Sequence, residues 1–199
     1  MRREGIQLNL PNLISFARLL SVPLTVWLIL NDFQLTAFYI FVAACISDAA
    51  DGFIAKKFNL QTEVGGYLDP LADKILVSSA FISFAMLNII EFWMVGLIIF
   101  RDLFVTGLRM AMEKKGLSMV TSTIAKAKTA AQMGIISFIL LILGIKGLSV
   151  AWAIPMLEIV REYHIIYNLT LIVTVFTVFT GITYLYTNRH TIQNFLERE

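Results

Sequence analysis

The sequence predicts an all-α integral membrane protein with six transmembrane helices. Of its 199 residues, 58% are hydrophobic and only 15% are charged, whereas soluble domains average about 45–50% and about 25%. A soluble protein of this size would have to leave much of that apolar surface in water. The apolar residues also fall into six stretches, each about the 20 residues that cross a bilayer as a helix. The predicted spans are residues 13–31, 35–56, 66–90, 92–112, 124–145 and 165–187, and they form one domain over residues 1–199.

The first predicted span, residues 13–31, has a signal peptide as its competing interpretation. Basic residues Arg2 and Arg3 precede its apolar run, as they do in signal peptides. The run is nevertheless too long, contains Arg18, and ends without a small-residue cleavage site. We therefore expect this span to be retained. The preceding residues 4–12 are too few to cross a membrane and are expected to lie along its surface.

The basic residues orient the predicted bundle. Lysine and arginine accumulate in the cytoplasmic loops of membrane proteins. Here every basic cluster falls at one end, namely before span one, between spans two and three, around the link between spans four and five, and after span six. The residues are Arg2, Arg3, Lys56, Lys57, Lys114, Lys115, Lys126, Lys128, Arg189 and Arg198. Both chain ends are therefore expected in the cytoplasm, and residues 146–164, on the opposite side, are predicted to form an interfacial loop or short helix.

Four aspartates lie within a window of 26 residues in predicted spans two and three, where charge is costly and each ionisable residue is a candidate functional residue. Asp48 and Asp51 are three residues apart near the cytoplasmic end of span two. Asp69 and Asp73 are four residues apart near the cytoplasmic start of span three. Each pair therefore shares one helix face. Because a short turn joins the two spans as antiparallel neighbours, all four carboxylates can converge at one depth.

Four converging carboxylates repel each other unless some are protonated or divalent cations lie among them. Oxygen ligands without a nearby His or Cys favour Mg²⁺, with Mn²⁺ and Ca²⁺ as alternatives. Two such ions about 4 Å apart are a recurring arrangement in phosphoryl transfer. Gly52 and Gly65 adjoin the carboxylates, where small residues allow close helix contact or leave room for a bulky polar ligand. The net charge of +2 is too small to indicate a nucleic-acid partner.

These residues also form a motif. The segment from Asp48 to Asp73 resembles the CDP-alcohol phosphotransferase signature, D-x2-D-G-x2-A-R-x8-G-x3-D-x3-D, with its spacing intact. The matching positions are Asp48, Asp51, Gly52, Ala55, Gly65, Asp69 and Asp73. Lys56 stands where the family has arginine. A lysine can still meet a phosphate, but as a point charge without the bidentate fork.

The resemblance implies an enzyme that transfers a phosphatidyl group from CDP-diacylglycerol to an alcohol and releases CMP. It further implies that the four aspartates hold two Mg²⁺ or Mn²⁺ ions and that Asp73 accepts the proton of the acceptor hydroxyl as general base. The residues expected to bind the CDP-linked donor are Asp48, Asp51, Gly52, Ala55, Lys56, Gly65 and Asp69. By the same analogy we expect a homodimer in a bacterial inner (plasma) membrane, with the active site facing the cytoplasm.

Segments outside the motif bear on the acceptor. Residues 10–14, 101–109 and 125–133 resemble members of the family that use glycerol 3-phosphate. Residues 68–75 and Asp102 are shared with members that use phosphatidylglycerol to make cardiolipin. The first resemblance carries more weight, and glycerol 3-phosphate is the expected acceptor. The residues expected to bind its phosphate are Arg101, Arg109, Lys126 and Lys128.

Other interpretations of these residues remain open. Arg101 could form an ion pair inside the bundle, for example with one of the aspartates. Arg109, Lys126 and Lys128 could simply mark the cytoplasmic side. A different class of protein, a divalent-cation transporter, would also use intramembrane aspartates. A transporter should place its site near mid-membrane with polar steps on both sides, whereas here the opposite half of every span is apolar.

Overall fold

The computed structural model of the protein describes the backbone of residues 10–58, 63–117, 123–148 and 150–196. Side chains are described over the same ranges except at residues 10–16, 48–58, 63–71, 73, 123, 125–126, 194 and 196. Within these ranges helices are the only regular secondary structure and there is no strand, which confirms the all-α prediction. The helices are α1 (Leu10–Leu30), α2 (Gln34–Phe58), α3 (Glu63–Met86), α4 (Phe92–Lys114), α5 (Thr123–Leu148), α6 (Ile154–Glu162), α7 (Ile165–Thr187) and α8 (Arg189–Leu196), with a 3-10 turn at Ala151–Ala153.

The six long helices coincide with the six apolar stretches to within four residues at every boundary, and two of the differences have a local cause. Helix α1 begins at Leu10, before the predicted start at residue 13, so that Pro11 lies in its first turn. Proline is tolerated there because the first amides of a helix have no partner within the helix. Helix α3 ends at Met86 and not at residue 90, because the chain reverses at Asn88.

Three of the described helix ends close with the same backbone motif. A residue just beyond the last turn adopts a positive φ, and the next amide donates to the carbonyl five residues earlier. In these three motifs the residue with positive φ is Asp32 (64°), Asn88 (55°) or Gly116 (72°). The amides of Phe33, Ile89 and Leu117 donate to Leu28, Phe84 and Met112 at 2.9, 2.9 and 3.0 Å. At Asp32 and Asn88 this motif produces the tight reversals that make α1 antiparallel to α2 and α3 antiparallel to α4.

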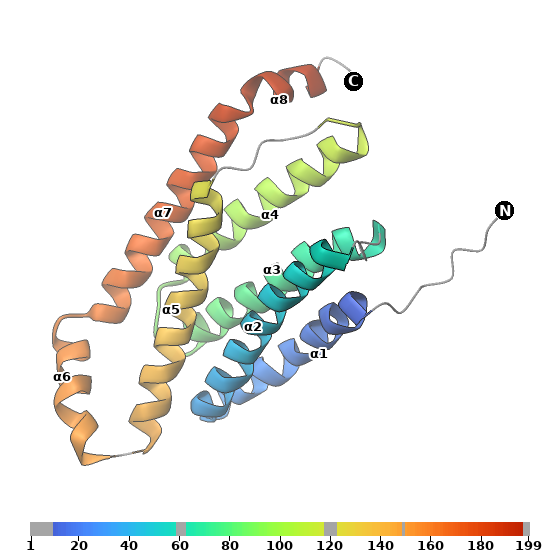
Figure 1. Ribbon diagram of the computed structural model, residues 1–199. Helices are drawn as coiled ribbons and strands as arrows, with labels where there is room; N and C mark the ends of the chain where they lie inside the picture. The colour runs from blue at the N-terminus through green and yellow to red at the C-terminus, as the bar shows by residue number, and fades with distance from the viewer. Residues whose placement is uncertain (1–9, 59–62, 118–122, 149, 197–199) are drawn as a thin grey trace.

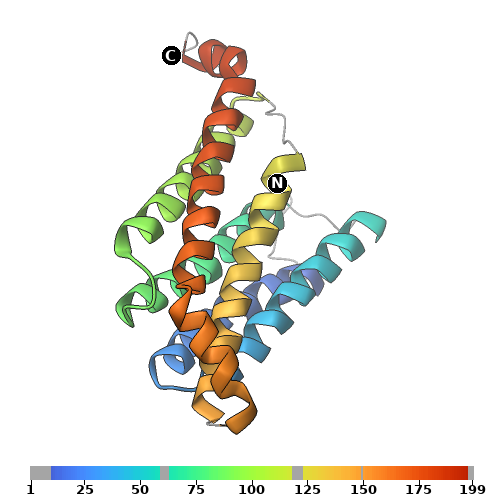
Figure 2. The same ribbon diagram turned by 90° about the vertical axis from the view of Figure 1, so that its left-hand side faces the viewer.

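The long helices form one bundle (Figures 1 and 2). Helix α1 packs against both α2 and α3, while α5 contacts α2, α3 and α7. Helix α4 lies against α3 and α7. The carboxyl ends of α2, α4 and α7 and the amino ends of α1, α3 and α5 point toward the same end of the bundle (Figure 1). That end is where the sequence places the aspartates and most of the basic residues.

Large apolar side chains fill the interior of the bundle. Phe41 of α2, Phe81 and Phe84 of α3 and Ile136 of α5 are fully buried in one continuous core. A second cluster joins α4, α7 and α8; its buried members are Val105, Met112 and Tyr184. Gly144 of α5 lies directly against the backbone of α2 at Leu35, which lets these two helices approach closely.

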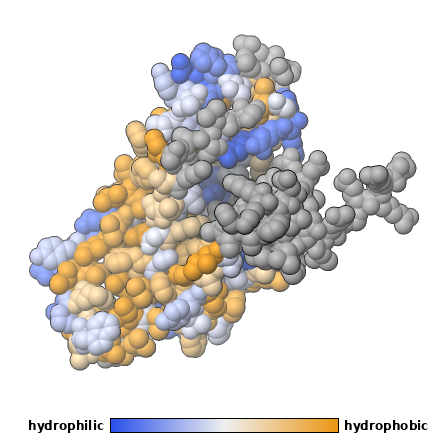
Figure 3. All heavy atoms as spheres, in the orientation of Figure 1, coloured by the Kyte–Doolittle hydropathy of each residue, from blue (hydrophilic) through white to orange (hydrophobic). Residues whose placement is uncertain are grey.

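The outer surface is apolar over much of its area, as expected for a membrane protein. Within the described residues, Ala127–Leu148 and Ile165–Thr187 are long and apolar enough to cross a membrane, judged by length and composition. Large hydrophobic side chains on several helices are exposed, including Trp27, Phe100 and Ile172. Figure 3 shows hydrophobic residues over the lower part of the molecule and hydrophilic residues around α8 and the end of α4. The count of six spans stays a prediction.

The segment that joins α5 to α7 was predicted to be an interfacial loop or short helix, and it contains the short helix α6. None of the residues of α6 is buried. Trp152 and Tyr163, at either end of this segment, are both exposed, and such side chains are common at membrane boundaries. The predicted interfacial stretch before α1 lies for the most part outside the described residues.

Candidate functional site

The four motif aspartates lie on two consecutive helices. Asp48 and Asp51 belong to the second half of α2, and Asp69 and Asp73 belong to the first half of α3. Because the two helices run in opposite directions, both pairs lie toward the same end of the bundle (Figure 1). Their side chains are outside the described part of the structure, so their convergence stays a prediction. The same holds for Gly52, Ala55, Lys56 and Gly65, the other predicted donor-binding residues.

A buried cluster of charged and polar side chains joins α4, α5 and α7. At its centre is Asp102 of α4, which is only 2% exposed, and its partner Lys128 of α5 is only 1% exposed. The Lys128 Nζ donates to Asp102 Oδ1 at 2.5 Å. The Gln132 Nε2 donates to the other carboxylate oxygen, Oδ2, at 3.2 Å and lies 3.4 Å from Thr177 Oγ1. Both oxygens of this buried carboxylate are therefore engaged, as buried charges require.

Arg101 completes the cluster from the same helix as Asp102. Its Nη1 donates to Asp102 Oδ1 at 3.2 Å. The stem of its side chain lies against α7 at Gly181, where a methyl group would come within 2.9 Å of Arg101 Cγ. Its Nε and Nη2 are buried and have no hydrogen-bond partner in the described part of the chain. Arg101 thus forms an ion pair inside the bundle, as one interpretation of the sequence predicts, and its partner is Asp102.

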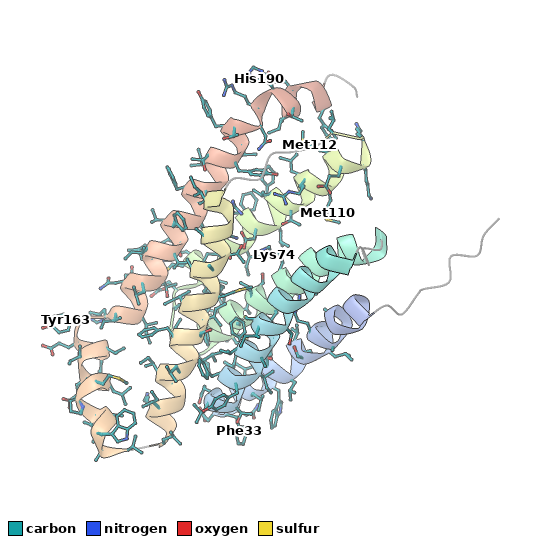
Figure 4. The ribbon with its side chains drawn as sticks, in the orientation of Figure 1. Phe33, Lys74, Met110, Met112, Tyr163 and His190 are labelled. Atoms are coloured by element: carbon teal, nitrogen blue, oxygen red, sulfur yellow. The ribbon has the colours of Figure 1, made fainter. Side chains whose placement is uncertain are left out.

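Lys74 places this cluster next to the aspartate motif. It lies on α3, in the central part of Figure 4, close enough for its charge to act on both Asp102 and Lys128. Since Lys74 directly follows Asp73 in the sequence, the motif and the cluster occupy neighbouring positions in the bundle. The cluster therefore lies near the part of the aspartate motif that belongs to α3.

Arg109 lies two turns beyond Arg101 on α4 and is held by α7. Its Nε donates to Tyr184 Oη at 3.2 Å, and its Cζ is 5.6 Å from the centre of the Tyr184 ring. Tyr184 itself is only 4% exposed. A cation over an aromatic face is stabilised by the ring electrons, and the hydroxyl adds a directional contact. Helix α7 therefore orients a second basic residue of α4.

The structure thus brings together part of the predicted phosphate-binding set. Arg101 and Lys128 meet through Asp102, while Arg109 is engaged with Tyr184. The side chain of Lys126 lies outside the described residues. Phosphate binding by these four residues is not tested by their geometry and stays a prediction.

The contributions of Gln132 and of helix α7 were not predicted from the sequence. Gln132 follows Lys128 by four residues, a spacing that puts both side chains on one face of α5. Helix α7 carries buried threonines at intervals of three or four residues, which mark an inward polar face. They are Thr170, Thr174, Thr177 and Thr180. Both patterns can be recognised in the sequence, but neither identifies which residue on another helix these side chains contact.

The cluster is suited to binding an anion that also carries hydroxyl groups. The free edge of Arg101 offers N–H donors, and Gln132 Oε1 is a buried acceptor without a partner among the described residues. Among the described side chains, no three His, Cys, Asp or Glu residues converge. The expectation of a metal site therefore rests on the motif aspartates of α2 and α3.

Comparisons with known proteins agree with the motif. A model of the CDP-alcohol phosphatidyltransferase family matches residues 8–179. Three similar proteins are each named CDP-diacylglycerol–glycerol-3-phosphate 3-phosphatidyltransferase. The Bacillus subtilis (strain 168) protein is 36% identical over 148 residues, which are 67% of this chain and 77% of that protein. The Rickettsia bellii protein is 35% identical over 179 residues (88% and 93%). The Rickettsia prowazekii protein is 35% identical over 182 residues (90% and 94%).

The family match covers helices α1 to α6 completely and most of α7. It therefore includes both the aspartate motif and the buried cluster around Asp102. On this extent of similarity the chain is a membrane transferase, and it belongs to the CDP-alcohol phosphatidyltransferase family.

Proposed function

We propose that this protein transfers the phosphatidyl group of CDP-diacylglycerol to glycerol 3-phosphate, giving phosphatidylglycerophosphate and CMP. Relatives named for this activity are 35% identical to this chain over 88% and 90% of its length. The observation that carries the choice of acceptor is the name of these relatives, which specifies glycerol 3-phosphate. The buried cluster of α4, α5 and α7 is compatible with this acceptor: among the described residues, Arg101 has guanidinium donors and Gln132 an amide oxygen without a partner, and glycerol 3-phosphate offers a phosphate and hydroxyls.

The aspartates of α2 and α3 fit a divalent-metal site by the chemistry of their donors. Asp48, Asp51, Asp69 and Asp73 offer only carboxylate oxygens, which Mg²⁺ and Mn²⁺ prefer. We propose that they would hold two such ions. Bound there, the ions would neutralise the donor diphosphate and the charge that develops on the departing CMP. The other motif residues that would contact the donor are Gly52, Ala55, Lys56 and Gly65.

Side chains of the protein would carry out the remaining steps. The acceptor phosphate would be held by Arg101 and Lys128, with Arg109 and Lys126 contributing further positive charge. A hydroxyl oxygen of glycerol 3-phosphate attacks the phosphorus that carries the diacylglycerol, and a new P–O bond forms as the P–O bond to CMP breaks. The hydroxyl proton passes to the carboxylate of Asp73, acting as general base. Holding both substrates in place removes much of the entropic barrier to this reaction.

The substrates also bear on location. CDP-diacylglycerol carries two acyl chains, so its reacting phosphate must lie at the membrane boundary. We propose a single-domain, multi-pass protein with six spans and both termini in the cytoplasm, and with the active site at the cytoplasmic end of the bundle. The basic residues gathered at that end support this orientation. A homodimer in a bacterial inner membrane is proposed on family analogy.

The test is release of CMP by purified protein in detergent with CDP-diacylglycerol and Mg²⁺, with candidate acceptors supplied one at a time. The Asp73→Asn variant serves as the blank. We expect release with glycerol 3-phosphate and none with phosphatidylglycerol. Release only with phosphatidylglycerol would instead make the protein a cardiolipin synthase. No metal-dependent release with any acceptor would remove the proposed activity and leave cation transport as the remaining explanation for the aspartates.

A further inference from the structure

The guanidinium of Arg101 has one edge that is engaged and one that is not. Nη1 is bound to Asp102 at 3.2 Å. Nε and Nη2 are buried, and within the described residues neither has a hydrogen-bond partner. Buried donors without a partner are costly, and each one in a folded protein calls for an explanation. A ligand that supplies oxygen atoms to this edge is such an explanation.

The geometry of the free edge indicates the kind of ligand. The N–H groups on Nε and Nη2 point in parallel from one side of a rigid plane. This fork matches two oxygens of a phosphate or carboxylate, which accept from it in a bidentate contact. A lysine at this position would offer no such fork. Among oxygen acceptors, the free edge therefore fits an oxyanion best.

Asp102 determines which edge is free. Its Oδ1 accepts from both Arg101 and Lys128, and its Oδ2 accepts from Gln132. With both oxygens engaged by different helices, the carboxylate is restrained from turning with the arginine. Arg101 is thus tethered through Nη1, and the Nε–Nη2 edge has no partner among the described residues.

Gly181 of α7 determines where that edge can lie. A Cβ at this position would be 2.9 Å from Arg101 Cγ, 3.2 Å from Nε and 3.6 Å from Cδ. Ordinary carbon–carbon contacts are about 3.5–4.0 Å. The three nearest atoms all belong to the side chain of Arg101, so the arginine, and not a backbone, would have to move. The glycine thus leaves the space in which the arginine stem and its Nε lie.

We propose that Gly181 is a positioning residue of the acceptor site, which keeps the Nε–Nη2 edge of Arg101 aligned with the acceptor phosphate. This inference rests on the proposed function, because the phosphate is that of glycerol 3-phosphate. It assigns α7 a part in substrate binding, although α7 lies far in sequence from the aspartate motif. Gly181 itself lies just beyond the residues matched by the family.

The test compares Gly181→Ala with Gly96→Ala, a matched control on α4 where an added Cβ meets nothing within 4 Å. Initial rates of CMP release give KM and kcat for glycerol 3-phosphate and KM for CDP-diacylglycerol. For Gly181→Ala we expect the KM of glycerol 3-phosphate to rise about tenfold or more, because a change of that size corresponds to the loss of one hydrogen bond to a charged group. The kcat and the KM of CDP-diacylglycerol should change less than about twofold, and the control should match the unsubstituted protein.

A double substitution separates positioning from packing. Arg101→Lys keeps the Cγ that the new methyl group would meet but removes the Nε–Nη2 edge. We therefore expect Gly181→Ala to have no further effect on the KM of glycerol 3-phosphate in the Arg101→Lys background. A purely structural role for Gly181 would give the same penalty in both backgrounds.

The outcomes are distinguishable. An active unsubstituted protein whose acceptor KM is unchanged by Gly181→Ala would overturn this inference alone, as would an equal effect in the Arg101→Lys background. A Gly181→Ala protein that does not fold would also overturn it, because the glycine would then be needed for helix packing. An unsubstituted protein that releases no CMP with glycerol 3-phosphate would overturn the proposed function and this inference with it.

Discussion

The contact between α2 and α5 at Gly144 yields a quantitative prediction about the stability of the bundle. A Cβ added at Gly144 would lie 2.9 Å from both Cα and Cβ of Leu35 and 3.0 Å from its backbone nitrogen. Two of these atoms belong to the backbone of α2, so no change of side-chain rotamer can relieve the clash. Gly144→Ala therefore requires the two helices to separate locally.

The size of the effect follows from the required displacement. Ordinary carbon–carbon contacts begin at about 3.5 Å, so the helices must move apart by about 0.6 Å over a well-packed contact. Overpacking of this kind typically costs about 1–3 kcal/mol. Replacing glycine with alanine in a helix also contributes a gain of up to about 1 kcal/mol, which would mask part of the cost.

Gly134→Ala provides the matched control, because Gly134 lies on the same helix and a Cβ there meets nothing within 4 Å. The gain in helix propensity is common to both variants and cancels in the comparison. We therefore expect Gly144→Ala to be less stable than Gly134→Ala by about 1–3 kcal/mol. The assay is reversible unfolding of purified protein in mixed micelles, titrated with SDS and followed by circular dichroism. Equal free energies of unfolding would refute the close approach of α2 and α5 at this position.

Three further predictions concern the site. Lys128→Met should lower the free energy of unfolding by about 3–5 kcal/mol, because the substitution leaves the buried carboxylate of Asp102 without its main partner. The same SDS titration measures this change. The double variant Lys128→Met/Asp102→Leu should regain part of the lost stability. Tyr184→Phe removes the oxygen that receives Arg109 Nε, so the KM of glycerol 3-phosphate should rise about three- to tenfold while the KM of CDP-diacylglycerol stays constant. Removal of divalent metal with EDTA should abolish CMP release, and added Mg²⁺ or Mn²⁺ should restore it.

Each of these has a contradicting result. A Lys128→Met protein as stable as the unsubstituted one would mean that the pair with Asp102 contributes nothing. An unchanged acceptor KM in Tyr184→Phe would remove Arg109 from the acceptor site. Full activity in EDTA would exclude the metal role proposed for the aspartates.

Much of the fold was predictable because its signals are local. A transmembrane helix must satisfy its own backbone hydrogen bonds and present about 20 apolar residues to lipid. Each of the six long helices can therefore be predicted from one continuous stretch of sequence. The end of α3 was misjudged by four residues because apolarity continues through Leu87, Ile89 and Ile90, whereas the helix stops where Asn88 takes a positive φ. Apolar content alone does not mark such a reversal.

The sequence by itself therefore determined the class of protein, the long helices and the aspartate motif, whose parts lie within 26 residues. Only the tertiary structure decided which side chains of different helices meet. Lys128 and Asp102 are 26 residues apart, Gln132 and Thr177 are 45 apart, and Arg109 and Tyr184 are 75 apart. The physical reason is that the order of residues along a helix determines which face is polar, whereas the partner of that face depends on how the helices pack and rotate against each other.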